Sequence, residues 1–219
     1  MKNIKALIKL DFQFVSPYWK WLVFYLGISI LFGILNQDGA VFALTITIFA
    51  MTVMFFPFEV TEKNNLNILY GALPTNRQSV IFARYCSSII LLVVSLIIAF
   101  AGSIIINAAF GNGFNATMEF LFLCISAGVY LVINSWQMPV FFRRGYLKGR
   151  LFAWIPAIIF IVLINLPALL DLFNVEFGGI FVIMIRNPLV TSLISVFAGI
   201  AAFIVSYFVS RILYLYKDM

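Results

Sequence analysis

Histidine is absent from this 219-residue chain, and charged residues make up only 10% of it. Without histidine the chain lacks a usual zinc ligand and the commonest general base, so metalloproteases of the HExxH type are excluded. The P-loop pattern GxxxxGK[ST] is also missing, which excludes ATP hydrolysis by that route. We therefore expect no catalytic residue, no metal site and no cofactor bound by this chain itself.

Cysteine is scarce as well, and basic residues do not gather into a patch. Cys86 and Cys124 both lie inside apolar runs, so we interpret them as small buried side chains rather than a disulfide framework. The formal net charge is +6, but the lysines and arginines occur singly or in small groups between apolar runs. This distribution is typical of membrane topology and argues against nucleic-acid binding.

Apolar side chains are what the sequence has in abundance, at 64% of all residues. A soluble core of this size could not hide so much apolar surface, so we predict an all-α integral membrane protein with a single domain, 1–219. Six apolar segments approach or exceed the length of about 20 residues that a membrane-spanning helix needs. The expected spans are 19–35, 39–58, 85–110, 120–142, 151–170 and 189–210. The apolar stretch 177–185 is too short to cross, so we expect it to dip into the outer leaflet or to cap the bundle.

Residues 2–15 predict an amphipathic helix that lies on the membrane surface. At about 100° per residue, Lys2, Lys5 and Lys9 share one side and apolar residues share the other. Asp11 falls in the middle of the apolar side. Either the helix frays there, before Ser16 and Pro17, or Asp11 pairs with a basic group of a neighbouring helix.

The distribution of positive charge predicts the orientation of the helices. With the N-terminus inside, 13 of the 14 Lys and Arg residues fall on the inner side, which leaves only Arg186 outside. Basic residues prefer the cytoplasmic side of a membrane. We therefore expect both chain termini to be cytoplasmic.

The longest polar interruption runs from Glu59 to Arg84 and falls on the inner side in this topology. Within it, four apolar residues follow i, i+3, i+4, i+7 spacing and so form one stripe on a short helix. They are Leu66, Leu69, Tyr70 and Leu73. Gly71 and Pro74 weaken or end this helix. Thr75 with Gln78 forms a capping box, and a helix from Thr75 to Phe110 would be about 54 Å long, so we expect it to protrude from the membrane.

Polar residues within the predicted spans are few. Asn107, Asn134, Gln137 and Asn165 could line a path, although hydrogen bonds between helices are the more frequent explanation. Glu119 lies at the outer mouth of the fourth span, where we expect it to snorkel or to be exposed, with proton handling as the alternative. In the sixth span Ala198, Ala202, Ser206 and Ser210 repeat every four residues, which indicates close contact with another helix, of this chain or of another.

The end of the second span and the segment that follows it resemble those of small ABC-2 type permeases, the membrane subunits of ATP-driven exporters. The similar features are an acidic residue at the end of the span, an Asn-rich amphipathic stretch, and the run Leu73-Pro74-Thr75-Asn76-Arg77 before the third span. The resemblance covers nearly the whole chain and implies a coupling helix that docks on a separate cytosolic ABC ATPase dimer, which binds the ATP. The matching positions are Glu59, Glu62, Asn64, Leu66, Leu69, Tyr70, Leu73, Pro74 and Arg77.

The size and the Phe- and Ile-rich composition are also similar to permeases of staphylococcal exporters for phenol-soluble modulins, which are amphipathic cytolytic peptides. This resemblance implies a bacterial cell membrane location, a hydrophobic or amphipathic substrate, and a second permease, identical or related, that completes the path. The stretch 171–186 departs from the family pattern because it is short for two re-entrant helices. The alternative function is a membrane scaffold or immunity protein that binds a partner without transport.

Overall fold

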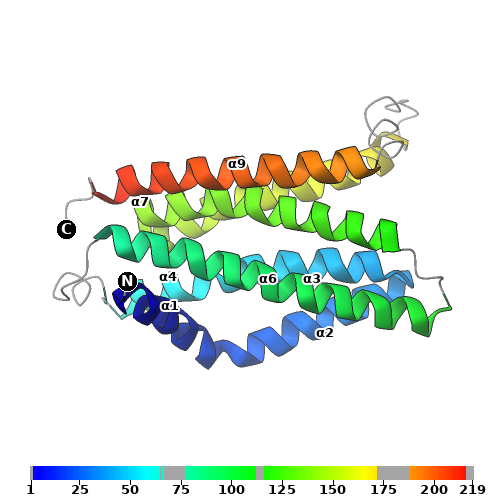
Figure 1. Ribbon diagram of the computed structural model, residues 1–219, viewed down its shortest axis with the longest axis horizontal. Helices are drawn as coiled ribbons and strands as arrows, with labels where there is room; N and C mark the ends of the chain where they lie inside the picture. Colours follow the sequence, from blue (N-terminus) through cyan, green and yellow to red (C-terminus); the bar gives the residue numbers. More distant parts are fainter. Residues whose placement is uncertain (1, 65, 67–76, 112–115, 172–187, 216–219) are drawn as a thin grey trace.

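A computed structural model describes residues 2–64, 66, 77–111, 116–171 and 188–215. Every regular element in these ranges is helical, so the predicted all-α fold is confirmed for the part of the chain described (Figure 1). The elements are α1 (Lys2–Val15), the 3₁₀ turn η1 (Ser16–Tyr18), α2 (Trp19–Asn36), α3 (Gly39–Val53), α4 (Phe55–Lys63), α6 (Arg77–Ala109), α7 (Ala116–Asp171) and α9 (Pro188–Leu215). The expected outer element at 177–185 lies outside the described residues.

Five helical runs within the described residues are long and apolar enough to cross a membrane, which makes this a multi-pass membrane protein. They are Ile4–Asn36, Gly39–Lys63, Gln78–Ala109, Ala116–Ile159 and Leu189–Tyr214. The predicted span 19–35 corresponds to α2, and the predicted span 39–58 comprises α3 and the first residues of α4, which are separated at Met54. Two of the six predicted spans, 120–142 and 151–170, both lie within α7.

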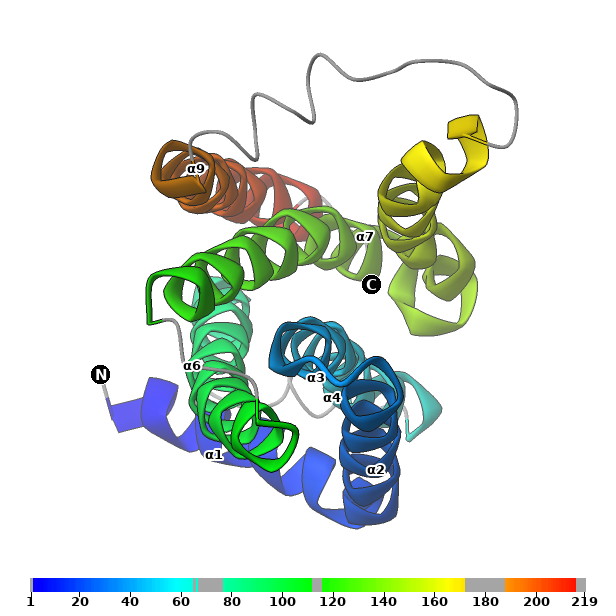
Figure 2. The same cartoon turned by 90° about the vertical axis from the view of Figure 1, so that its right-hand side faces the viewer.

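α7 turns back on itself at Gly145, whose φ of 76° and ψ of 176° are not helical. Trp136 donates a hydrogen bond from Nε1 to the Phe152 carbonyl at 3.0 Å, and Gln137 donates to the Ala153 carbonyl at 3.3 Å. These bonds join residues on opposite sides of Gly145, so the two arms of α7 run antiparallel and side by side (Figures 1 and 2). We call residues 116–144 the first arm and residues 146–171 the second arm.

The N-terminal helix has the predicted bounds, and its apolar side packs on α6. Leu7 of α1 is buried against Val80 and Ala83 of α6. Lys5 and Lys9 are exposed, as the amphipathic pattern requires. α1 continues through η1 into α2, so the expected fraying before Ser16 is wrong.

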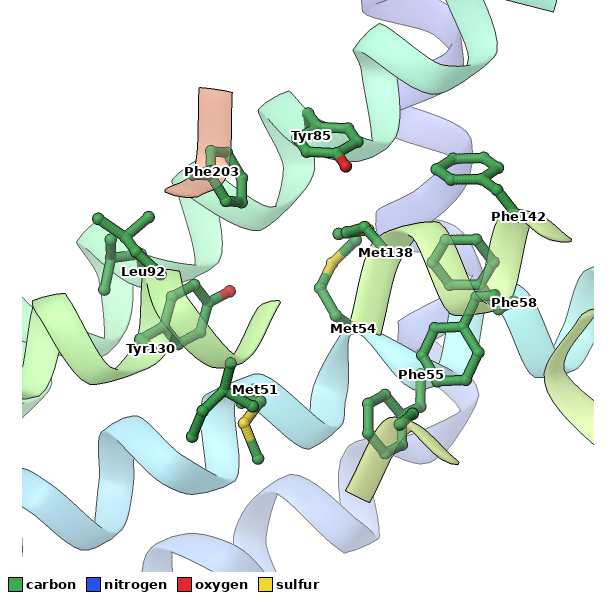
Figure 3. Close-up of a cluster of buried hydrophobic side chains, with 14 of the residues drawn as sticks. Met51, Met54, Phe55, Phe58, Tyr85, Leu92, Tyr130, Met138, Phe142 and Phe203 are labelled. Atoms are coloured by element: carbon green, nitrogen blue, oxygen red, sulfur yellow. The ribbon is translucent and has the colours of Figure 1, made fainter. Parts of the chain in front are cut away.

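The main core lies where α3 and α4 meet α6, the first arm of α7 and α9 (Figure 3). Met51 and Met54 come from the α3–α4 side, Tyr85 from α6 and Phe203 from α9. In a bilayer such contacts stabilise helix association through close packing and interhelical hydrogen bonds, because lipid tails are as apolar as the side chains. Tyr85 contributes both, since its hydroxyl lies 2.6 Å from Ser206 Oγ and 2.8 Å from Ser210 Oγ.

Small residues bring α9 into backbone contact with the first arm of α7. A Cβ atom on Gly128 would lie 2.6 Å from the carbonyl oxygen of Ser195, and a Cβ atom on Gly199 would lie 3.0 Å from the carbonyl oxygen of Gly128. Of the small-residue face predicted in the sixth span, Ser206 and Ser210 find a partner within this chain in Tyr85, whereas Ala198 is exposed.

Gly128→Ala is expected to destabilise the folded protein by about 1–3 kcal/mol, because the new methyl group would meet backbone atoms that cannot move aside. Equilibrium unfolding in mixed detergent micelles, followed by circular dichroism, measures the change. Gly27→Ala is the matched control, since a Cβ atom added there would enter open space. Equal stability of the two variants would contradict the close contact of α7 with α9.

Candidate functional site

One end of the bundle holds α1, α4, the first turn of α6, Gly145 and the last turn of α9 (Figure 1). We call it the α4 end. Five of the nine residues predicted to dock an ATPase are described there: Glu59, Glu62, Asn64, Leu66 and Arg77. Leu69, Tyr70, Leu73 and Pro74 lie outside the described residues, as does Thr75 of the predicted capping box. The long helix expected after them is present as α6, which begins at Arg77 and continues without a break to Ala109.

Arg84 of α6 is the centre of the α4 end and is almost completely buried. Its Nη1 lies 3.1 Å from Asp11 Oδ1 of α1. Its Nη2 donates to Thr61 Oγ1 at 2.9 Å and to the Pro57 carbonyl at 3.2 Å, both on α4. One guanidinium group therefore joins three helices, which its planar set of N–H donors allows.

Asp11 has two partners from α6, since it also accepts a hydrogen bond from Ser87 Oγ at 3.0 Å. It is 3% exposed, so the carboxylate has lost nearly all contact with solvent. An unpaired charge in such a place would be costly, which explains why an acidic residue lies within the apolar side of α1 opposite a buried arginine. Of the two interpretations left open by the sequence, pairing with a basic group of a neighbouring helix is the correct one.

Glu62 holds the reversal of α7 in place. Its Oε2 accepts hydrogen bonds from the backbone N–H groups of Tyr146 and of Leu147, the latter at 2.9 Å. These are among the first N–H groups of the second arm, which lack partners within the helix and attract negative charge. A Cβ atom on Gly145 would lie 2.8 Å from both carboxylate oxygens, and φ is positive there, so glycine suits this position on two grounds.

The remaining described residues of the predicted docking set contact the end of α4 or the apolar cluster between α1 and α6. Glu59 pairs with Lys63 one turn later, an exposed ion pair of the kind that adds little stability. Asn64 donates from Nδ2 to the Val60 carbonyl at 3.0 Å and so closes α4. Leu66 packs on the cluster that α1 and α6 form. Only the backbone of Arg77 is described.

Beside Glu62 and Arg84 is a cavity of about 80 Å³. It has room for water but is far smaller than the roughly 300–1,000 Å³ of sites that bind cofactors or small molecules. In the described ranges no three His, Cys, Asp or Glu residues come together as a metal site would require. The arrangement of side chains at the α4 end is one that holds helices together.

A second polar cluster lies at the opposite end of the bundle, and its carboxylate was interpreted wrongly from the sequence. Glu119 is buried, not exposed, and accepts a hydrogen bond from Asn107 Nδ2. The same amide accepts from the Gly39 N–H at 2.9 Å through Oδ1. These bonds tie α3, α6 and α7 together. Nothing in the spacing of the three residues signals that they meet.

The other polar residues expected at depth also bond to protein groups. Gln137 links the two arms of α7, as the prediction of interhelical hydrogen bonds requires. Asn134 instead donates to the Tyr130 carbonyl of its own helix at 3.1 Å. The side chain of Asn165 lies outside the described part of the chain.

Several apolar helices of spanning length, joined at both ends by buried polar contacts, define a helical multi-pass membrane protein. Comparison with models of protein families matches residues 6–215 to ABC-2 family transporter protein. The chain therefore belongs to the ABC-2 transporter family and is a permease component, which has no catalytic activity of its own. No curated protein and no solved structure matches the chain. Membership of this family implies an ATPase partner.

Asp11→Leu is expected to destabilise the protein by about 3–5 kcal/mol, because it leaves Arg84 buried without its counter-charge. Adding Arg84→Met should restore at least half of the loss, since Thr61 Oγ1 already donates to the Pro57 carbonyl and keeps that group paired. Unfolding in mixed micelles measures both variants, and Lys63→Ala, which removes the exposed partner of the ion pair with Glu59, is the control. A cost below about 1 kcal/mol for Asp11→Leu, or no recovery in the double variant, would contradict the pairing.

Proposed function

We propose that this chain is the membrane half of an ABC exporter, and that the segment from Glu59 to Arg84 docks on a cytosolic ABC ATPase dimer and passes its movement into the bundle. The observation that carries the proposal is the position of Arg84. This residue ends the segment and binds both α1 and α4 from α6. A push on the segment would therefore move three helices together.

The length of α6 supports this role. At 33 residues it extends for about 50 Å, more than the roughly 30 Å of hydrocarbon in a bilayer. Arg84 lies about 10 Å along the helix from Arg77. The start of α6 would then protrude into the cytosol, with the buried pair close to the membrane boundary. Closure of the ATPase dimer on ATP binding would act on this protruding end, in the manner of a rigid-body rotation.

Six crossings with both termini inside fit the reversal at Gly145. The first arm of α7 is about 43 Å long and the second about 39 Å, so each has the length to cross. The α4 end carries exposed basic side chains from several elements, and basic residues favour the cytoplasmic side. They include Lys5, Lys9, Lys63, Arg143, Arg144, Lys148 and Arg150.

A second permease, identical or related, would complete the transport path, since six helices form only half of an exporter. We propose a hydrophobic or amphipathic substrate, with cytolytic peptides as one class. No charged residue occurs between Arg84 and Glu119, between Glu119 and Arg143, or between Pro188 and Arg211. A path built from these stretches offers apolar and neutral polar contacts, which suit such a molecule. A scaffold or immunity protein is the alternative, and it would need no coupled ATPase.

Leu69→Asp and Tyr70→Asp are each expected to reduce co-purification of a candidate ABC ATPase at least tenfold, because a charge would enter the apolar stripe that docks. Gln13→Asp, an exposed position on α1, is the matched control and should leave the complex intact. Arg77→Glu should allow insertion and ATP hydrolysis but abolish transport in vesicles.

Co-purification also requires the α4 end to be cytosolic, so the same measurement tests the orientation. Unchanged recovery of the ATPase with both aspartate variants would remove the docking role from the stripe. A gene neighbourhood that encodes no ABC ATPase, together with a chain that purifies alone, would favour the scaffold.

A further inference from the structure

A groove of about 490 Å³ runs between the first arm of α7, the start of its second arm and the last half of α9. The helices that form it lie beside one another in Figures 1 and 2. Its walls are apolar over most of their length. The principal apolar residues are Trp136, Pro139, Val140, Phe152, Val205 and Val209. Arg143 and Arg144 line the groove where it reaches the α4 end.

Both arginines are exposed, and neither has an acidic partner among the residues that the structure describes. Among the described residues, the ion pairs are Lys63 with Glu59 and Arg84 with Asp11, so neither Arg143 nor Arg144 takes part in one. The Arg144 guanidinium carbon lies 4.0 Å from the centre of the Phe152 ring, a cation–π contact that holds the charge against the groove wall. The groove therefore offers two positive charges that have no acidic partner in the described ranges.

The hydroxyl groups of the groove are already satisfied by the protein. Ser135 donates to the Val132 carbonyl at 2.6 Å, and Ser206 bonds with Tyr85. The charged part of a ligand would therefore bind at the arginines, while its remainder lay along apolar surface.

The dimensions of the groove correspond to one leaflet of a bilayer. From Ala202 to Leu213 along α9 the distance is about 16 Å, close to half of the roughly 30 Å hydrocarbon thickness. An amphipathic molecule could place its anionic head at Arg143 and Arg144 and direct its tail toward Trp136. Its head would then lie at the membrane boundary and its tail would point toward the bilayer centre, as in a lipid. A second copy of the chain fits less well, because a two-fold contact at this end of the groove would bring arginines of both copies together.

We propose that this groove is a binding site for an anionic phospholipid, with the phosphate held by Arg143 and Arg144 and an acyl chain packed between α7 and α9. Guanidinium groups suit phosphate because their N–H donors match its oxygens in pairs. A lipid bound there would fill the space between the two arms of α7 and α9. This site is independent of the proposed docking of an ATPase.

The test uses the full chain with Trp19, Trp21 and Trp154 replaced by phenylalanine, which leaves Trp136 in the groove as the only tryptophan, excited at a wavelength that tyrosine does not absorb. Phosphatidylglycerol or phosphatidylcholine with brominated acyl chains is titrated into dodecyl maltoside micelles that contain the protein. We expect phosphatidylglycerol to quench Trp136 at a mole fraction on the order of tenfold lower than phosphatidylcholine, in line with the attraction of basic residues for anionic lipids.

Arg143→Gln together with Arg144→Gln should abolish this preference. Lys20→Gln together with Lys148→Gln, which removes the same charge from exposed positions outside the groove, should leave it unchanged. Without any arginine change, unlabelled phosphatidylglycerol should relieve the quenching in a saturable way, which tests the site even if the arginine variant fails to fold.

Three results would overturn the proposal. Equal quenching by the two lipids would show that the groove does not select charge. A preference that survives the loss of both arginines would place the headgroup elsewhere. Protection of Trp136 from both brominated lipids would show that a second copy of the chain covers the groove.

Discussion

The buried contact of Arg84 with Asp11, Thr61 and the Pro57 carbonyl is the constraint on which the α4 end depends. Charged groups in an apolar protein are costly to bury, and the Arg84 guanidinium offsets this cost through an ion pair with α1 and hydrogen bonds to α4. One side chain therefore contacts both α1 and α4 from α6, in addition to the apolar packing of Leu7 on Val80 and Ala83. Removing Asp11 would leave the Arg84 charge buried without its counter-charge. We therefore expect α1, α4 and α6 to move as one unit.

At two other places a carboxylate likewise bonds to polar groups of a different helix. Glu62 binds free N–H groups where α7 reverses, and Glu119 binds Asn107 at the opposite end of the bundle. Carboxylates that would suggest chemistry in a soluble enzyme here close helix ends and join neighbouring helices. The long apolar stretches between them carry no charge. This division suits a permease, which has no reaction of its own to catalyse and must move as connected helices.

Local patterns were sufficient to predict much of this fold. The period of the apolar residues gave α1 its bounds, and the length of the apolar runs predicted helices that could cross a membrane, of which the described residues contain five. Both predictions depend on neighbouring residues alone. The resemblance to ABC-2 permeases in the stretch after the second span agrees with the family match. The docking face itself stays a prediction, since most of its apolar stripe lies outside the described residues.

Contacts between residues distant in sequence could not be predicted in the same way. Asp11 interrupts the amphipathic pattern of α1, so the sequence singles it out. Its pairing with Arg84 of α6 depends on how the two helices pack and could not be predicted from the sequence. Gly145 was one glycine in a basic stretch, and its positive φ and the approach of Glu62, which together explain it, appear only in the folded chain. Glu119 was expected to be exposed because its position at the end of a span says nothing about Asn107, whose bond buries it.

The claim that Arg84 makes one body of α1, α4 and α6 can be tested by measuring a distance between α1 and α4. Spin labels at Lys5 and Lys63, both exposed, in a chain whose native cysteines are replaced, report this distance by pulsed electron resonance. In the complex with its ATPase, a single narrow distribution is expected with and without trapped ATP, and Arg84→Met should broaden or lengthen it. A distance that shifts on ATP trapping in the unsubstituted chain, or one that Arg84→Met leaves unchanged, would contradict the account.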